Sequence, residues 1–181
     1  LYYMSEESHK TYCDFVANLD KSNLHKIYHD KQYGFPIEDD NELFGRLILE
    51  INQAGLSWTT ILKKKNNFRN AYSGFNIQKI AEYDEKDIKQ LLNDSSIIRN
   101  RLKVNAAIYN AQKVLLIQKE FGSFRYWLEE NRGRKLEEWV KLFKKTFKFT
   151  GGEITKEFLI STGILEGAHT EDCPIFYKIN N

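Results

Sequence analysis

Apolar residues at helical spacing recur along most of this chain, and this pattern constrains its fold more than any other feature. Proline, which tends to end helices, occurs only at Pro36 and Pro174. No stretch alternates between apolar and polar residues for long enough to predict a strand in a sheet. We therefore predict an all-α fold, with helices over residues 22–30, 40–54, 57–72, 76–81, 85–93, 97–121, 123–130, 135–146 and 153–162.

The composition indicates a water-soluble chain that forms one compact domain, or one domain with a small appended lobe. Of its 181 residues, 41% are hydrophobic, 14% are aromatic and 29% are charged. A long apolar run and a signal-peptide pattern are both absent, so we expect a cytoplasmic protein without a membrane partner. With only two cysteines, a structural disulfide is not expected. The net charge of +2 is too small to indicate a nucleic-acid partner by itself.

One acid, Glu50, lies on the apolar side of the helix predicted over residues 40–54. Its neighbours in the same arc are leucine and alanine side chains. An acid in this setting is costly unless something pairs with it. Gly55 is expected to end the helix and to bring Leu56 and Trp58 close to the carboxylate. The stretch is either an ordinary helix end with one acid at the core margin or the wall of a functional pocket.

A second pattern lies between the helices predicted over residues 85–93 and 97–121. The first helix ends on an asparagine, and an aspartate and two serines follow; all four residues favour turns. The long helix carries Arg99, Arg101 and Lys103 in its first turns. This arrangement is typical of a helix-hairpin-helix, whose free backbone N–H groups hold a DNA phosphate. The alternative is a plain hairpin of two helices.

Two further patterns have ordinary structural interpretations. The basic run Lys63–Lys65 is either a solvated helix face or a set of phosphate contacts. Aromatic residues at helical spacing over 121–149 are expected to pack in the core rather than to form a ligand site.

Cysteine and histidine near the two ends of the chain form a possible metal site. His169 and Cys173 are four residues apart, and Cys13 and His29 complete a possible Cys2His2 set. Two thiolates and two imidazoles around zinc make a closed structural site without an open position for catalysis. Such a site would hold the N-terminal segment against the C-terminal tail.

Several of these motifs together resemble the monofunctional 3-methyladenine DNA glycosylase I family, within the helix-hairpin-helix glycosylases. The most specific is the block Gln-Ala-Gly-Leu-Ser-Trp at residues 53–58. The matching segments follow the family's order and lie at residues 12–13, 27–30, 33–36, 53–64, 97–101 and 147–149, with His169 and Cys173 at the end.

The resemblance implies a fold of two lobes within a single catalytic unit of residues 1–181. Residues 38–147 would form the helical lobe with the helix-hairpin-helix. Residues 5–37 and 148–181 would form a terminal lobe around one structural Zn²⁺ per chain.

The resemblance also implies a role for particular residues. Glu50 would be the catalytic pocket acid, Tyr28 and Trp58 would stack on the base, and Tyr33 would form a further wall. Contacts to DNA would come from Leu56, which wedges into the duplex, and from Ser96, Ile98 and Arg99 at the hairpin. The zinc ligands would be Cys13, His29, His169 and Cys173.

The implied function is base-excision repair. The protein would act as a monomer on double-stranded DNA with alkylated bases and hydrolyse the N-glycosidic bond of 3-methyladenine. Methylation makes this base cationic, so Glu50 would recognise the charge, and Tyr28 and Trp58 would stack on the ring. A lysine is absent at the position where bifunctional relatives carry their nucleophile, so no strand cleavage is expected. The alternatives are a non-catalytic binder of damaged DNA with the same fold and a zinc-stabilised helical interaction domain.

The chain departs from the family pattern at a few positions. Ser96 stands where a hairpin glycine is expected, so a turn with positive φ would cost about 1 kcal/mol or would adopt another shape. Tyr33 and Phe15 each replace a tryptophan, and Lys156-Glu157 replaces an aromatic-serine pair. One residue is also inserted between residues 163 and 169. We expect these changes to affect the shape of the pocket and the affinity for DNA.

Overall fold

The computed structural model describes residues 11–179, and over this range it is helical without strands, as the sequence predicts. No helix in this range is long and apolar enough to cross a membrane. The helices are α1 (Tyr12–Ala17), α2 (Leu24–Lys31), α3 (Asp40–Gln53), α4 (Trp58–Ala71), α5 (Ile77–Ala81), α6 (Glu85–Asn93), α7 (Arg101–Phe121), α8 (Phe124–Glu130), α9 (Leu136–Thr146), α10 (Gly152–Ser161) and α11 (Phe176–Ile179), with a 3₁₀ turn, η1 (Ser73–Phe75), after α4.

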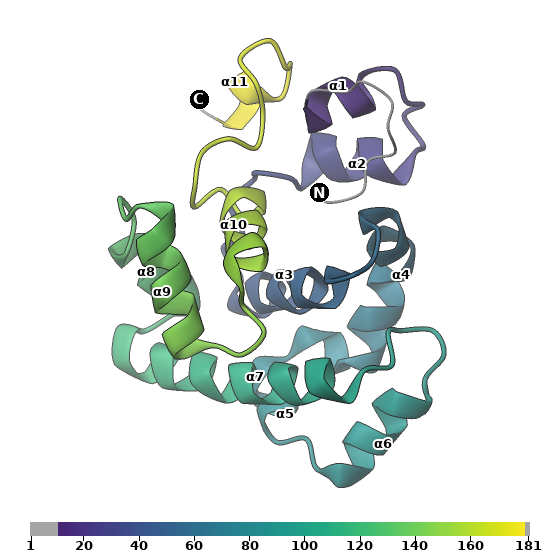
Figure 1. Cartoon of the computed structure of the whole chain (residues 1–181), viewed down its shortest axis with the longest axis vertical. Helices are drawn as coiled ribbons and strands as arrows, with labels where there is room; N and C mark the ends of the chain where they lie inside the picture. Colours follow the sequence, from purple (N-terminus) through teal and green to yellow (C-terminus); the bar gives the residue numbers. More distant parts are fainter. Residues whose placement is uncertain (1–10, 180–181) are drawn as a thin grey trace.

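Helix α3 lies at the centre of the molecule and packs against α4, α7, α8 and α10 (Figure 1). Its first turn is fixed by polar contacts, because the Asp39 side chain accepts a hydrogen bond from Glu42 N at 2.9 Å. The Asp40 carboxylate accepts from Phe124 N and Arg125 N at the start of α8. Gly45 lets η1 approach, because a Cβ at this position would lie 2.3 Å from the ring of Phe75.

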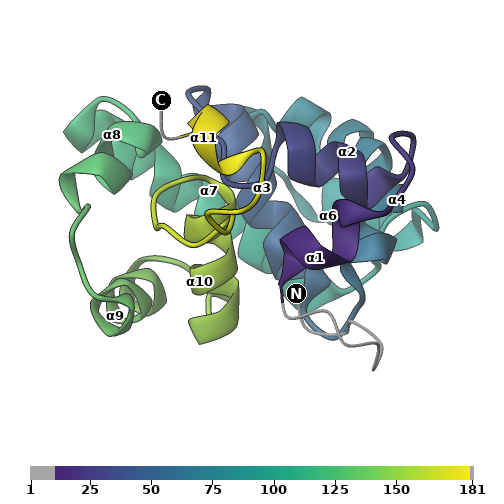
Figure 2. The same cartoon turned by 90° about the horizontal axis from the view of Figure 1, so that it is seen from above.

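The terminal segments lie together at one end of the molecule. Figure 1 shows α1, α2 and α11 above the body that is formed by α3 to α9, and Figure 2 shows the molecule from that end. Gly34, after α2, donates its N–H to Ser161 O at the end of α10 at 2.9 Å. Gly163 also approaches closely, since a Cβ there would lie 2.7 Å from Gly34 O. The proposed lobe boundaries stay a prediction, and their outermost residues, 5–10 and 180–181, lie outside the described range.

The sequence pattern was wrong about the start of the long helix. It predicts a helix from residue 97, whereas α7 begins at Arg101. The Asn100 side chain caps the helix by accepting from Lys103 N at 3.1 Å. Ile97 is buried in the core outside the helix, so its apolar side chain continues the helical pattern without being helical.

Candidate active site and metal-binding cluster

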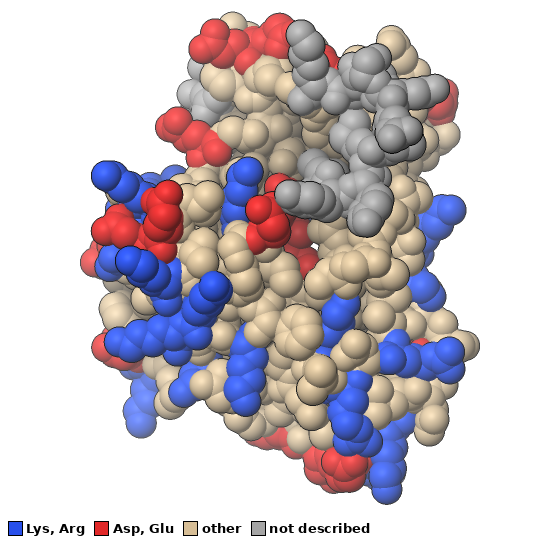
Figure 3. All heavy atoms as spheres, in the orientation of Figure 1, with Lys and Arg blue, Asp and Glu red and all other residues tan. Residues whose placement is uncertain are grey.

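The end of α3 presents Glu50 to a cavity of about 430 Å³. The lining residues from α3 and the following loop are Glu50 and residues 53–56, and those from the start of α10 are residues 151–154 and Glu157. Gly55 has a φ of +81° and turns the chain out of α3. Leu56 then lies half-buried at the cavity wall. Figure 3 shows acidic side chains near the middle of this face, with Lys and Arg spread around them.

Glu50 is buried, with 3% of its surface exposed, and its surroundings set its protonation. Ser161 Oγ donates to Glu50 Oε1 at 3.4 Å. Burial raises the pKa of Glu50 to about 8, although the positive charge of Arg46 opposes the increase. The negative charge of Glu157 raises this pKa further.

A buried arginine connects Glu50 to the aromatic residues behind it. Arg46 lies one turn before Glu50 on α3 and donates to Tyr28 Oη and to Ser161 O, both at 3.1 Å. Its guanidinium also lies over the Tyr28 ring, 5.1 Å from the ring centroid. The arginine therefore fixes Tyr28 relative to α3 and α10.

Three aromatic side chains pack together behind the acid. Tyr28 lies 5.2 Å from Trp58 and 5.7 Å from Tyr33, between ring centroids, and all three side chains are buried. Burial raises the pKa of the Tyr28 and Tyr33 hydroxyls, and the charges of Glu50 and Glu157 raise both further. In the described part of the chain, Trp58 Nε1 is buried without a hydrogen-bond partner. These rings form a wall behind Glu50 and do not line the cavity itself.

The turn between α6 and α7 is stabilised by side chains. Ser96 N donates to Asp94 Oδ1 at 2.8 Å, so this backbone N–H already has an acceptor. Lys64 Nζ donates to Ser96 O at 2.8 Å and to Ser95 O at 3.4 Å. Ser96 is not among the described residues with positive φ, so the turn adopts a shape that needs no glycine. Ile98 is half-buried and Arg99 is exposed beside it.

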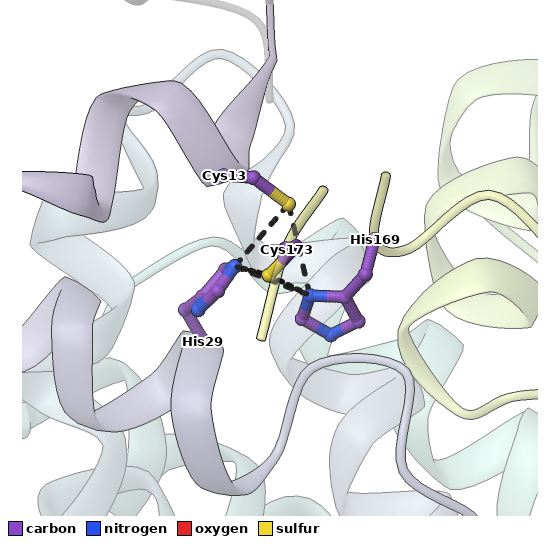
Figure 4. Close-up of side chains that lie close together, drawn as sticks. All are labelled: Cys13, His29, His169 and Cys173. Atoms are coloured by element: carbon purple, nitrogen blue, oxygen red, sulfur yellow. Dashed lines mark hydrogen bonds between the residues drawn. The ribbon is translucent and has the colours of Figure 1, made fainter. Parts of the chain in front are cut away.

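Four side chains from the two ends of the chain form a compact cluster (Figure 4). The ligand atoms of Cys13, His29, His169 and Cys173 all lie within 4.8 Å of one another. His29 Nε2 is 3.4 Å from Cys13 Sγ and 3.1 Å from His169 Nδ1, and Cys173 Sγ is 3.6 Å from His169 Nδ1. Both cysteines are free thiols.

The two histidines direct an unprotonated nitrogen into this cluster. His29 Nδ1 donates to Asp30 Oδ1, and His169 Nε2 donates to Tyr33 O, both at 2.7 Å. Burial lowers the pKa of both imidazoles, which favours their neutral form. Each ring therefore presents a lone pair to the cluster, as a metal ligand must.

Comparison with known proteins identifies the family to which this chain belongs. A sequence model of the methyladenine glycosylase family matches residues 18–141. The chain belongs to the methyladenine glycosylase family.

Relatives are similar over nearly their whole length. The DNA-3-methyladenine glycosylase of Haemophilus influenzae is 31% identical, with 91% of this chain and 97% of that protein covered. DNA-3-methyladenine glycosylase 1 of Escherichia coli is 32% identical, with 89% and 94% covered. The structure of 3-methyladenine DNA glycosylase I from Staphylococcus aureus, which describes 3-methyladenine recognition, superposes with a TM-score of 0.78 at 32% identity and covers 86% of this chain and 93% of that one.

The structure brings together some of the site residues predicted from the family resemblance and separates others. Glu50 and Leu56 line the cavity, and Tyr28, Tyr33 and Trp58 lie behind it. The hairpin residues Ser96, Ile98 and Arg99 form a separate surface beside α7. The four predicted metal ligands meet in one cluster.

Sequence reasoning missed several residues around this methyladenine glycosylase pocket. Arg46 could have been found, because it lies four residues before Glu50 on the same helix face. No sequence pattern indicates Ser161 as a site residue, because its contact with Glu50 joins positions 111 residues apart. Lys103 was assigned to the hairpin, but it is 6% exposed and donates to Asn52 O and Ala54 O at the end of α3.

Proposed function

We propose that this chain is a monofunctional DNA glycosylase that hydrolyses the N-glycosidic bond of 3-methyladenine in alkylated double-stranded DNA. Family membership and relatives named for this activity support the proposal. The observation that carries it is the buried Glu50 carboxylate at the wall of a cavity. The cavity volume falls within the range of small-molecule sites.

Glu50 recognises the charge of the methylated base. A base must leave the duplex to reach the cavity, and a damaged base costs less to extrude. The N3-methylated adenine carries a positive charge until the glycosidic bond breaks. A cation entering the cavity favours the ionised form of Glu50, which then accepts hydrogen bonds from the purine edge. Unmodified adenine lacks this charge and does not stabilise the ionised form of the acid.

The aromatic wall adds stacking to this charge recognition. Trp58 and Tyr28 are already in contact at 5.2 Å between centroids, so a base cannot enter between them unless the rings separate. Both rings are buried, so we infer that a movement first opens a face of Tyr28 or Trp58 to the cavity and that the base then stacks on it, with Tyr33 behind. The buried Trp58 N–H offers a hydrogen-bond donor to the incoming ligand.

Two surfaces contact DNA in this proposal. Leu56 leaves its half-buried position and fills the gap in the duplex that the extruded base leaves. The helix-hairpin-helix formed by α6, the turn and α7 binds the backbone through Ser96, Ile98 and Arg99. Because Ser96 N already donates to Asp94, Ser96 contributes its hydroxyl, whereas the Ile98 and Arg99 N–H groups have no acceptor among the described residues.

The Cys-His cluster fits one structural Zn²⁺. Tetrahedral zinc with thiolate and imidazole ligands holds its donor atoms about 3.3–3.8 Å apart, and the donor distances here include 3.1, 3.4 and 3.6 Å. Four protein ligands leave no open coordination position, so the ion supplies structural stability rather than chemistry. Held together by it, the terminal segments would form the second lobe.

The reaction needs no nucleophilic lysine. Lys103, the buried lysine beside the cavity loop, donates to two backbone carbonyls. The attacking group is therefore water, and the products are free base and an intact strand with an abasic site. The two relatives are DNA-3-methyladenine glycosylases of bacteria, and we infer a monomer that acts on DNA in the cytoplasm.

Identification of the released base tests this function. The purified chain is incubated with methylated duplex DNA, and the products are separated by chromatography and on a denaturing gel. We expect free 3-methyladenine and unbroken strands. Binding to the DNA without release of a base would instead favour the non-catalytic binder, and strand cleavage would contradict the monofunctional reaction.

A further inference from the structure

The cavity contains a second carboxylate that the recognition of the base leaves unused. Glu157 on α10 and Glu50 on α3 both line the cavity. Its negative charge raises the pKa of Glu50, Tyr28 and Tyr33. The carboxylate of Glu157 therefore lies within electrostatic range of all three side chains.

Glu157 lies on α10 between a buried residue that contacts Glu50 and an exposed residue of the cavity lining. Glu153, Glu157 and Ser161 are spaced four residues apart and share one face of the helix. Ser161 is fully buried and donates to Glu50, whereas Glu153 is exposed. Glu157 is half-buried between them.

This spacing matches the dimensions of a bound nucleoside. Ser161 and Glu157 are separated by about 6 Å along the helix axis, because four residues rise about 1.5 Å each. The outer edge of a purine is separated from its glycosidic bond by a similar length. A nucleoside whose base edge met Glu50 beside Ser161 would have its sugar carbon C1′ at the level of Glu157.

We propose that Glu157 is a catalytic residue that orients and deprotonates the attacking water. This inference rests on the proposed glycosylase function. The bond between C1′ and the base nitrogen breaks, and its electron pair neutralises the methylated base, which leaves as neutral 3-methyladenine. The water oxygen forms a bond to C1′, and its proton passes to Glu157 and then to solvent.

A carboxylate at this position meets the two remaining needs of the reaction. The methylated base leaves without being protonated, so the protein must supply only an activated water and stabilise the positive charge that develops on the sugar. A negative group beside C1′ does both. General-base catalysis of this kind contributes about 10²–10⁴-fold to a rate.

The test compares Glu157→Gln with Glu137→Gln, which removes an exposed carboxylate of α9 that lies outside the cavity. Single-turnover release of 3-methyladenine from methylated DNA is measured with excess enzyme. Affinity for free 3-methyladenine is measured in parallel by tryptophan fluorescence. We expect Glu157→Gln to slow release by about 10²–10³-fold with near wild-type affinity, and Glu137→Gln to match the wild type in both.

Chemical rescue of a variant with a truncated side chain distinguishes a catalytic role of Glu157 from a structural one. In Glu157→Ala, sodium formate should restore much of the lost rate, because the small carboxylate replaces the missing base. Equal rates for Glu157→Gln and the wild type would overturn the inference, as would a loss of affinity alone or a lack of rescue by formate. If the wild type itself releases no base, the proposed function fails instead.

Discussion

Burying a carboxylate costs free energy, and the surroundings of Glu50 offset that cost only in part. Ser161 donates one hydrogen bond, and Arg46 is close enough to favour the charge, yet burial still raises the pKa to about 8. The free protein therefore holds a proton on Glu50 at neutral pH. A cationic base removes this cost when it binds, so the destabilised acid favours charged ligands over neutral ones.

This proton predicts a dependence of stability on pH. Between about pH 4.5 and 8 the folded protein retains a proton on Glu50 that the unfolded chain releases, so the free energy of unfolding falls as pH rises. In Glu50→Gln this contribution is absent. We expect the wild type to lose stability relative to the variant over this window, on the order of a few kcal/mol.

Urea unfolding of both proteins at pH 5 and pH 8.5 measures the difference. Glu137→Gln, which alters an exposed acid, should follow the wild type. Identical pH slopes for the wild type and Glu50→Gln would mean that Glu50 titrates normally.

Helical spacing was sufficient to predict that Glu50 faces apolar neighbours, but not what lies opposite it. From α10, more than 100 residues later in the chain, Glu157 lines the cavity and Ser161 donates a hydrogen bond to Glu50. Such contacts depend on how helices cross, which local periodicity does not encode.

Helix α7 connects the two surfaces that are proposed to contact DNA. Its N-terminus follows the hairpin turn, and Lys103 in its first turn reaches the carbonyls of Asn52 and Ala54 at 3.1 and 2.9 Å. These carbonyls lie at the C-terminus of α3, where a positive charge is favourable. Lys103 thus fixes the loop that carries Leu56 relative to the hairpin.

Replacement of this lysine should loosen the loop. Lys103→Met removes two charge-assisted hydrogen bonds, which contribute about 1.5–3 kcal/mol each. We expect a lower melting temperature and faster amide hydrogen exchange over residues 53–57. Lys119→Met, at an exposed position on the same helix, serves as the control. Unchanged exchange over the loop would show that Lys103 does not position it.

The bounds of most helices followed from the sequence, while those that depend on caps or distant contacts did not. The predicted helices over 40–54 and 85–93 agree with α3 and α6 to within one residue. The short α1 and α11 were missed, because six and four residues are too few to show a period. The Asn100 cap sets the start of α7, although the apolar pattern already begins on the N-terminal side of this residue.

Over the whole molecule, the two ends of the chain meet at the Cys-His cluster. Tyr33 connects this cluster to the pocket, because its carbonyl accepts from His169 and its ring packs on Tyr28. The family resemblance predicted these four residues as metal ligands. Their spacing along the sequence only made them one possible set of two cysteines and two histidines. Their convergence depends on the complete fold, since Cys13 and His169 are 156 residues apart.

Zinc removal should therefore destabilise the whole chain. We expect about one Zn²⁺ per chain by elemental analysis and a melting temperature that falls by about 10 °C or more on chelation. Cys173→Ala should lose the ion, whereas His25→Gln, which changes a histidine outside the cluster, should retain it. A metal-free preparation with the same melting temperature would contradict a structural zinc.

The most direct test of the central claim is the single-turnover release of 3-methyladenine by the wild type and by Glu50→Gln. Loss of a charged hydrogen-bonding partner predicts that the variant is about 10–100-fold slower, with unmodified adenine released by neither protein. Equal rates for the two proteins, or release of unmodified adenine by the wild type, would contradict recognition of the cationic base by Glu50.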